Sequence, residues 1–142
     1  MTRDAMLSLA ERRREAWNAH DSTALAAMHA EDGVVVSPTG GVLEGRAEIE
    51  RVYRLWFAAF PDIRFVEDES LIDGDRMAQI ARMAGTHSGD FFGLAPTGRH
   101  LETQVAMIMR VADGVIVEER RIYDFTGLLV QVGILRAKPA KP

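Results

Sequence analysis

The 142-residue sequence contains no cysteine, which excludes disulfide bonds, thiol nucleophiles and cysteine-based zinc or iron–sulfur sites. It also lacks an excess of positive charge, because 17 Lys and Arg residues stand against 21 Asp and Glu residues. Nucleic-acid binding normally requires a basic stripe. The mildly acidic balance therefore argues against a nucleic-acid partner.

Long apolar runs are missing as well. Charged residues interrupt each apolar stretch well before the roughly 18 residues that a membrane-spanning helix needs, and residues 1–4 lead into a charged helix rather than a signal-peptide hydrophobic region. The default expectation is a cytoplasmic protein with no membrane partner. The length fits one domain, expected over residues 1–135, followed by a flexible tail over residues 136–142.

The spacing of apolar residues predicts a definite order of elements. Three helices are expected, over residues 4–19, 22–30 and 46–60. Five strands are expected, over residues 33–37, 63–73, 76–87, 101–112 and 115–124. Residues 125–135 are expected to form a short helical or extended segment. This order is typical of an α+β domain in which a curved, mostly antiparallel sheet wraps around N-terminal helices as a barrel-like cone.

Two hairpin turns predict how the strands pair. The turn at Gly74-Asp75 places Glu67 opposite Arg82 as a cross-strand ion pair. The dipeptide Asp113-Gly114 is the strongest signal for a tight two-residue turn, and strict alternation from it predicts one mostly apolar face. The pairs expected on that face are Val111–Ile116, Met109–Glu118, Met107–Arg120, Val105–Ile122 and Thr103–Asp124.

Asp124 is the most informative residue under this pairing, because it places a carboxyl group on an apolar wall. Burial disfavours the ionised form and raises the pKa of such a carboxyl. A raised pKa suits a general acid/base that takes a proton from an activated carbon and returns it to an oxygen. The alternative interpretation is that Asp124 caps the segment that follows it.

Several segments together carry a family resemblance. They are the run from Gly85 to Arg99 with its Pro96-Thr97-Gly98-Arg99 ending, the strand Gly114-Val115-Ile116-Val117-Glu118, Asp124 six residues further on, Leu128-Leu129-Val130-Gln131-Val132-Gly133, and, near the N-terminus, Trp17-Asn18-Ala19-His20-Asp21 and Ala30-Glu31-Asp32. This set resembles the SnoaL-like polyketide cyclase (ester cyclase) family, which belongs to the cone-shaped, nuclear-transport-factor-2-like superfamily.

The resemblance implies an intramolecular aldol cyclisation of an aromatic polyketide ester, without a cofactor and with Asp124 as the general acid/base. One position departs from the family pattern. Many members have an aromatic residue, usually Trp, two positions after the residue that matches Glu118, and this sequence has Arg120 there. Arg120 would lower the pKa of Asp124 and favour an anionic substrate, or it would form a buried structural ion pair with a carboxylate.

Other residues are candidates for the same site. His87 ends its predicted strand beside a Gly-rich loop, where an imidazole can relay protons or hydrogen-bond the backbone. The histidine spacing does not indicate a metal site, and no cofactor is expected. The side chains expected to line a cavity for a bulky apolar or aromatic ligand are Trp17, Trp56, Phe60, Phe91, Met83, Thr103, Met107 and Ile122.

Two further function classes stay open at this point, because a fold does not decide a function. One is a small-molecule binding protein with the same cavity and no turnover. The other is an interaction module whose sheet binds another chain. The face that carries Arg110, Glu119, Arg121 and Tyr123 is too mixed for a core, so it is expected to lie outside and to form a two-fold homodimer interface.

Overall fold

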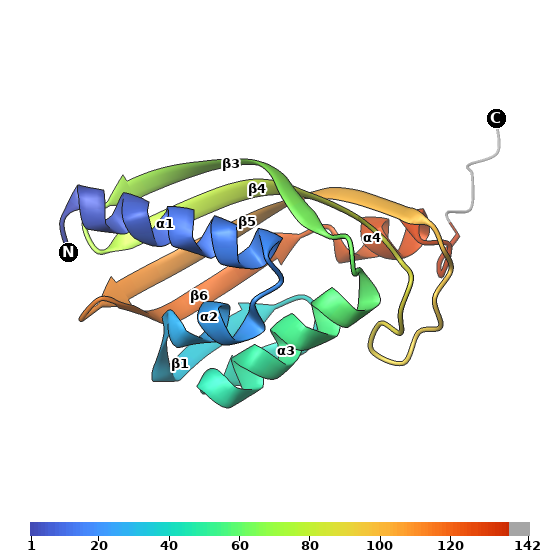
Figure 1. The fold of residues 1–142 in the computed structure, drawn as a ribbon, viewed down its shortest axis with the longest axis horizontal. Coiled ribbons are helices and arrows are strands. Elements are labelled where there is room, and N and C mark those ends of the chain that lie inside the picture. Colours follow the sequence, from blue (N-terminus) through green and yellow to red (C-terminus); the bar gives the residue numbers. More distant parts are fainter. Residues whose placement is uncertain (137–142) are drawn as a thin grey trace.

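Six strands form one mixed sheet in the computed structural model, which describes residues 1–136 (Figure 1). The strands are β1 (His29–Ser37), β2 (Gly41–Glu44), β3 (Arg64–Asp73), β4 (Arg76–Thr86), β5 (His100–Ala112) and β6 (Val115–Tyr123). Their order across the sheet is β2-β1-β6-β5-β4-β3. Within the described residues, β1 and β6 run parallel and the other neighbouring pairs run antiparallel.

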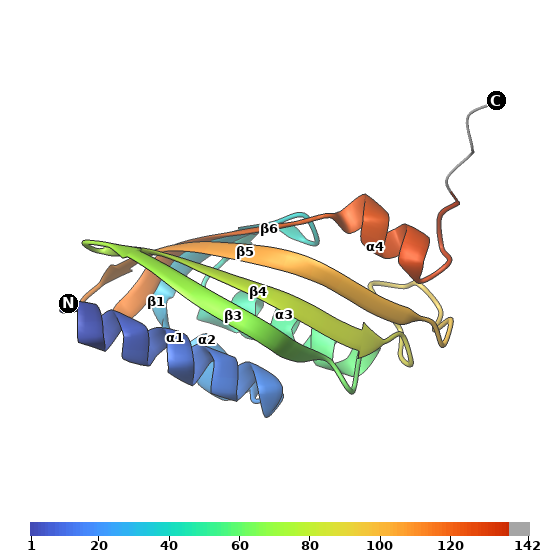
Figure 2. The same ribbon diagram turned by 90° about the horizontal axis from the view of Figure 1, so that it is seen from above.

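The helices are α1 (Arg3–Asn18), α2 (Ser22–Ala27), α3 (Arg46–Ala59) and α4 (Phe125–Gln131). Helices α1, α2 and α3 lie on one side of the bent sheet, whereas α4 extends from the end of β6 (Figure 2). The predicted α+β architecture, with a mostly antiparallel curved sheet around three N-terminal helices, is therefore confirmed.

Helix α1 begins after Thr2, whose hydroxyl accepts a hydrogen bond from the Ala5 backbone N–H at 3.1 Å. One face of the helix is buried, and it contains Met6, Leu9, Ala10, Arg13, Ala16 and Trp17. The buried face of α3 contains Ile49, Val52, Tyr53, Trp56 and Ala59. These two stripes cover the concave face of the sheet, so the main core lies between the helices and the sheet.

Both predicted hairpins are present. Asp113 and Gly114 have φ values of 52° and 80°, the left-handed conformations that a tight two-residue turn requires. Glu67 pairs with Arg82 across β3 and β4 at 3.0 Å, as expected. The sequence analysis missed β2, which has four residues and follows a turn at Gly40.

The pairing of β5 and β6 differs from strict alternation. Val111 lies opposite Ile116 as predicted, but the next pair is Arg110 with Glu118, so Val117 is an extra residue in a β-bulge. The predicted register is therefore wrong beyond Ile116. A bulge shifts every later side chain to the other face of the sheet.

Because of the bulge, the residues of β6 after Ile116 lie on the face of the sheet opposite to the predicted one. Glu119 is buried and Arg121 and Tyr123 are partly buried on the helix side, whereas Glu118 and Arg120 are exposed. Ile122, predicted to face the cavity, is 53% exposed on the outer face. The outer face predicted from Glu119, Arg121 and Tyr123 is corrected in the same way.

Asp124 does not lie on the apolar wall. It is exposed and is the N-cap of α4, where its carboxylate accepts a hydrogen bond from the Gly127 backbone N–H at 2.8 Å. The ladder between β5 and β6 ends at the pair Val105–Tyr123, so the predicted Thr103–Asp124 pair is absent from the described residues. The structure corresponds to the capping alternative.

Among residues 1–136, the helices are too short or too polar to cross a membrane. The tail predicted over residues 136–142 lies outside the described residues except for Arg136.

Candidate functional site

A narrow cavity lies between the three N-terminal helices and the concave face of the sheet. Its wall contains Arg13, Trp17, Leu25, Ser37, Tyr53, Trp56, Phe65, Met83, Val105, Met107, Arg121 and Tyr123. The cavity volume is about 30 Å³, which is room for one or two water molecules. Aromatic packing shapes the wall, because Trp17 stacks on Phe65 with ring centroids 4.6 Å apart and Trp56 meets Tyr123 edge-on at 5.7 Å.

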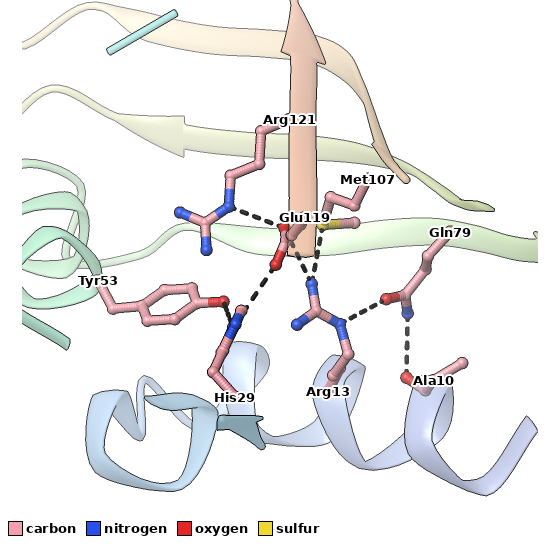
Figure 3. A network of polar contacts seen from close by, with 8 residues as sticks. All are labelled: Ala10, Arg13, His29, Tyr53, Gln79, Met107, Glu119 and Arg121. Atoms are coloured by element: carbon pink, nitrogen blue, oxygen red, sulfur yellow. Dashed lines mark hydrogen bonds and ion pairs between the residues drawn. The ribbon is translucent and has the colours of Figure 1, made fainter. Parts of the chain in front are cut away.

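A buried ionic network forms the polar end of this cavity (Figure 3). Glu119 is its centre and comes from β6, where the bulge turns it inward. Its Oε2 accepts hydrogen bonds from Arg121 Nε at 2.8 Å and from Arg13 Nη2 at 3.4 Å. Its Oε1 lies 3.5 Å from His29 Nε2. Three elements, α1, β1 and β6, therefore meet at one carboxylate.

Neighbouring groups fix the two arginines. Gln79 accepts a hydrogen bond from Arg13 Nε at 3.1 Å and donates one to the Ala10 carbonyl at 3.0 Å. Arg121 places its guanidinium carbon 4.6 Å from the centre of the Tyr53 ring, a cation–π contact. These contacts orient the guanidinium groups before any ligand binds.

The charges in the network determine each protonation state. Burial would raise the pKa of Glu119, but the charges of Arg121 and Arg13 outweigh it and hold that pKa well below its usual range. Burial lowers the pKa of His29 to about 3, although Glu119 opposes this shift. At neutral pH, Glu119 is therefore ionised and His29 is neutral.

Several polar atoms of this region have no hydrogen-bond partner within residues 1–136. Three of them are donors on the cavity wall: Arg13 Nη1, Trp17 Nε1 and Arg121 Nη2. Buried donors are nearly always satisfied in folded proteins. Unpaired donors on the wall of one cavity indicate a place for a ligand or water that accepts hydrogen bonds.

Tyr123 places a hydroxyl group on the same wall. Burial raises the pKa of Tyr123, while hydrogen bonding to Thr39 and Ser37 and the charge of Arg121 oppose the shift. The phenol is therefore neutral at pH 7. Tyr53, also on the wall, has its hydroxyl 3.2 Å from His29 Nε2.

The structure brings only some of the predicted site residues together. Trp17, Trp56, Met83 and Met107 line the cavity. Phe60 and Phe91 are fully buried and pack against each other and against Trp56, behind the wall. Thr103 is partly buried opposite Met83 but lies outside the wall, and Arg120, Ile122 and Asp124 are exposed.

His87 is fully buried and does not line the cavity. Its Nδ1 lies 3.1 Å from Thr97 Oγ1, and its backbone N–H and C=O bond to Arg99 and Gly98. These contacts hold the loop between β4 and β5 closed, so the position favours the hydrogen-bonding interpretation. In the described part of the chain, no three His, Asp or Glu side chains are placed to hold a metal ion.

Sequence reasoning missed the charged half of the site. Glu119, Arg121 and Tyr123 were assigned to the outer face because the bulge was not anticipated. Arg13 carried a usable signal, because it shares the helical face of Leu9, Ala10 and Trp17. An arginine on an apolar stripe requires a buried partner.

Comparison with known proteins identifies the family. The model of the SnoaL-like polyketide cyclase family matches residues 8–132. The chain belongs to this family. No curated protein matches the sequence.

Several solved structures are similar to nearly the whole chain. IdmH from Streptomyces antibioticus, a proposed polyketide cyclase, is 31% identical over 89% of this chain and 97% of its own, with a TM-score of 0.75. AclR from Streptomyces galilaeus, a proposed hydroxylase, is 26% identical over 97% of this chain and 91% of its own, with a TM-score of 0.82. An NTF2-like protein of unknown function from Burkholderia pseudomallei, 18% identical over 94% of this chain and 99% of its own, has a TM-score of 0.78. The fold of this SnoaL-like protein is the NTF2-like fold.

Proposed function

We propose that this SnoaL-like protein is a cofactor-independent enzyme that performs aldol-type cyclisation, or a related isomerisation, of a bulky apolar or aromatic substrate. The observation that carries the proposal is the composition of the cavity wall. Aromatic and methionine side chains supply apolar contact, and the polar groups of the lining residues are tyrosine and serine hydroxyls, two indole N–H groups and two guanidinium groups. Family membership supports the same class of chemistry.

An aldol cyclisation removes a proton from a carbon beside a carbonyl and adds a proton to the oxygen of a second carbonyl. Negative charge develops on the enolate oxygen in the first step. Arg13 and Arg121 are fixed in advance at the polar end of the cavity, and oriented cations in a dry site stabilise such charge strongly. We assign enolate stabilisation to these two residues.

Protonation of the new alkoxide is assigned to Tyr123. Its phenol is neutral at pH 7, so it can donate a proton to the developing alkoxide. Arg121, on the same face of β6, stabilises the resulting phenolate, which then regains a proton from water. The carbon proton is lost to water when the 1,3-dicarbonyl binds as its enolate. Glu119 is not given this role, because two guanidinium groups hold it ionised and it does not line the wall.

The size of the cavity sets a condition on this function. A space for one or two water molecules is far smaller than the ~300–1,000 Å³ of usual ligand pockets. A bulky substrate therefore requires the wall to open. Met83 and Met107 are the wall residues with the most adaptable side chains, and we expect them to change rotamer on binding.

A non-catalytic binding protein is the second candidate, and one observation favours it. Within residues 1–136, neither a carboxylate nor an imidazole lines the cavity, although these groups perform most general acid/base catalysis. Such a protein would bind the same ligands and release them unchanged.

Tyr123→Phe tests the assignment, because it keeps the ring and removes the proton. With an aromatic polyketide ester that bears an enolisable 1,3-dicarbonyl, the variant is expected to lose about 10²- to 10⁴-fold in kcat with nearly unchanged affinity. Asp124→Asn is the matched control, since Asn also caps helices well and the site is exposed. Its kcat should equal that of the wild type.

Two results would count against the assignment. A wild-type rate in Tyr123→Phe together with a large loss in Asp124→Asn would return the acid/base role to Asp124. Saturable binding of the ester by the wild type without any product would favour the binding protein.

A further inference from the structure

We infer that the polar end of the cavity is a subsite for one planar oxyanion group, a carboxylate or the enolate of a 1,3-dicarbonyl, held by Arg13, Trp17 and Arg121. The inference rests on the proposed function, because it names the substrate group that this same cavity holds.

The unpaired polar atoms of the wall residues at this end of the cavity are all hydrogen-bond donors. Arg13 Nη1, Trp17 Nε1 and Arg121 Nη2 are buried, lack partners within residues 1–136, and belong to wall residues. Guanidinium and indole nitrogens donate and cannot accept. In Figure 3 the unpaired guanidinium nitrogens of both arginines lie on the side of the network toward Tyr53. The complement of such a wall is a group that only accepts.

Positive charge exceeds negative charge at this end of the cavity. Arg13 and Arg121 share one carboxylate, Glu119, and His29 is neutral at pH 7. The next acidic group outward, Asp68, already pairs with Arg14 at 3.4 Å. Another nearby cation, Arg46, donates a hydrogen bond to the His29 carbonyl at 2.8 Å and, being positive itself, does not offset the positive charge. One buried positive charge therefore has no buried counter-ion, and a monoanion would supply it.

Space limits the group to a small one. A volume of about 30 Å³ holds two oxygen atoms as readily as it holds two water molecules. Two coplanar oxygens on a carboxylate or an enolised 1,3-dicarbonyl match the planar forks of arginine. Water would satisfy the donors but would leave the charge unbalanced.

The two tryptophans of the chain provide a direct readout. In a nitrogen–proton correlation spectrum they give two indole signals, and Trp17→Phe identifies the signal of Trp17. Acetate is the carboxylate probe, and acetamide is its uncharged analogue of similar shape. We expect acetate to shift the Trp17 signal saturably and acetamide at equal concentration to leave it in place.

Variants separate a site from a general salt effect. Arg121→Gln is expected to weaken acetate binding by roughly tenfold or more, while Arg120→Gln removes the same charge from the outer face and should leave it unchanged. Arg121→Gln also removes a partner of Glu119, so loss of folding is a competing explanation. Glu119→Gln avoids it, because removing the shared carboxylate should strengthen acetate binding by roughly tenfold, a gain that damage to the fold does not produce. If Glu119→Gln does not fold without acetate, recovery of its indole spectrum on adding acetate is the same result.

Acetylacetone distinguishes the two sources of the oxyanion. Binding of acetate alone assigns the subsite to carboxylates, and acetylacetone binding that strengthens as its enol ionises assigns it to enolates. Equal responses to acetate and acetamide, no response to either anion, or weaker acetate binding by Glu119→Gln would overturn the inference. If the protein binds the anions but turns over no substrate, the oxyanion subsite is supported and the proposed enzymatic function is refuted. If it turns over substrate but does not prefer anions, only the oxyanion subsite is refuted.

Discussion

Glu118 and Glu119 are adjacent and chemically identical, yet they have different roles. Glu118 is exposed and pairs with Arg110 at 3.2 Å across the strand. Glu119 is enclosed by Arg121, Arg13 and His29 and is held ionised. A carboxylate fixed in this way acts as a counter-ion that orients two arginines. The proposed proton transfer consequently belongs to Tyr123, which lines the cavity and is neutral.

His29 should make the stability of this protein depend on pH. Its folded-state pKa of about 3 lies below the usual 6.5, so the unfolded chain binds more protons between these values. Stability is complete above pH 6.5 and is lost as the pH falls toward 3, with a slope approaching about 1.4 kcal/mol per pH unit. Urea unfolding between pH 7 and 5 measures this slope before Glu119 contributes.

His29→Gln should remove most of that slope, since glutamine does not titrate. His100→Gln changes an exposed histidine at the start of β5 and should retain it. A wild-type unfolding free energy that stays constant from pH 7 to 5 would show that His29 is protonated equally in both states.

At the scale of elements, most of the fold follows from local patterns. Apolar spacing predicted α1 and α3, and Asp113-Gly114 predicted the hairpin of β5 and β6. The parallel pairing of β1 with β6 was not predicted, because no local pattern joins two strands so far apart in the chain. Strand β2 was missed because four residues give alternation too little length to register.

The bulge could not be read from the sequence for a physical reason. Residues 118–121 read Glu-Glu-Arg-Arg, so either register buries one carboxylate and one guanidinium. The alternation of apolar and polar residues therefore does not indicate which of the two faces is buried. The choice depends on Arg13 and His29, which reach the inner face from α1 and β1. Such contacts join residues that are far apart in the sequence, so no local pattern predicts them.

Cross-linking tests the register of β5 and β6 in a chain that has no native cysteine. Opposed residues of an antiparallel pair have Cα atoms about 4.5–5.5 Å apart, which suits a disulfide. The double variant Arg110→Cys with Glu118→Cys should oxidise readily, because these residues are paired. Met109→Cys with Glu118→Cys, the pair expected from strict alternation, should stay reduced. Thiol titration and mass spectrometry after mild oxidation measure how fast each pair forms a disulfide. Faster cross-linking of the Met109→Cys and Glu118→Cys pair would contradict the bulge.

At the scale of the whole molecule, α1, α2 and α3 cover one face of the sheet, and on the outer face only α4, near the end of β5, lies close to the strands within residues 1–136 (Figure 2). The corrected register places Ile122, Ala106 and Ile80 in one row across this face, and Val36, Arg120 and Ile108 in a neighbouring row. Ile122 is 53% and Val36 is 44% exposed. We propose that a second copy of the chain covers this mixed surface as a two-fold homodimer.

Light scattering at high micromolar concentration should give twice the monomer mass of 15.7 kDa. Ile122→Asp places a charge at the centre of the proposed interface and should yield monomers, while Leu7→Asp alters an exposed leucine on α1 and should leave the dimer intact. A wild-type protein that is monomeric at that concentration would refute the dimer.

We propose that function resides in the cavity of Arg13, Arg121 and Tyr123 rather than beside Asp124. The most direct measurement is a crystal structure of the protein soaked with benzoylacetone, an aromatic 1,3-diketone. We expect its two oxygens within hydrogen-bond distance of the Arg121 and Arg13 guanidinium groups, its ring against Trp17, and Met83 or Met107 in a new rotamer. An occupied site at the start of α4, with the diketone bonded to Asp124 and the cavity unchanged, would contradict the account.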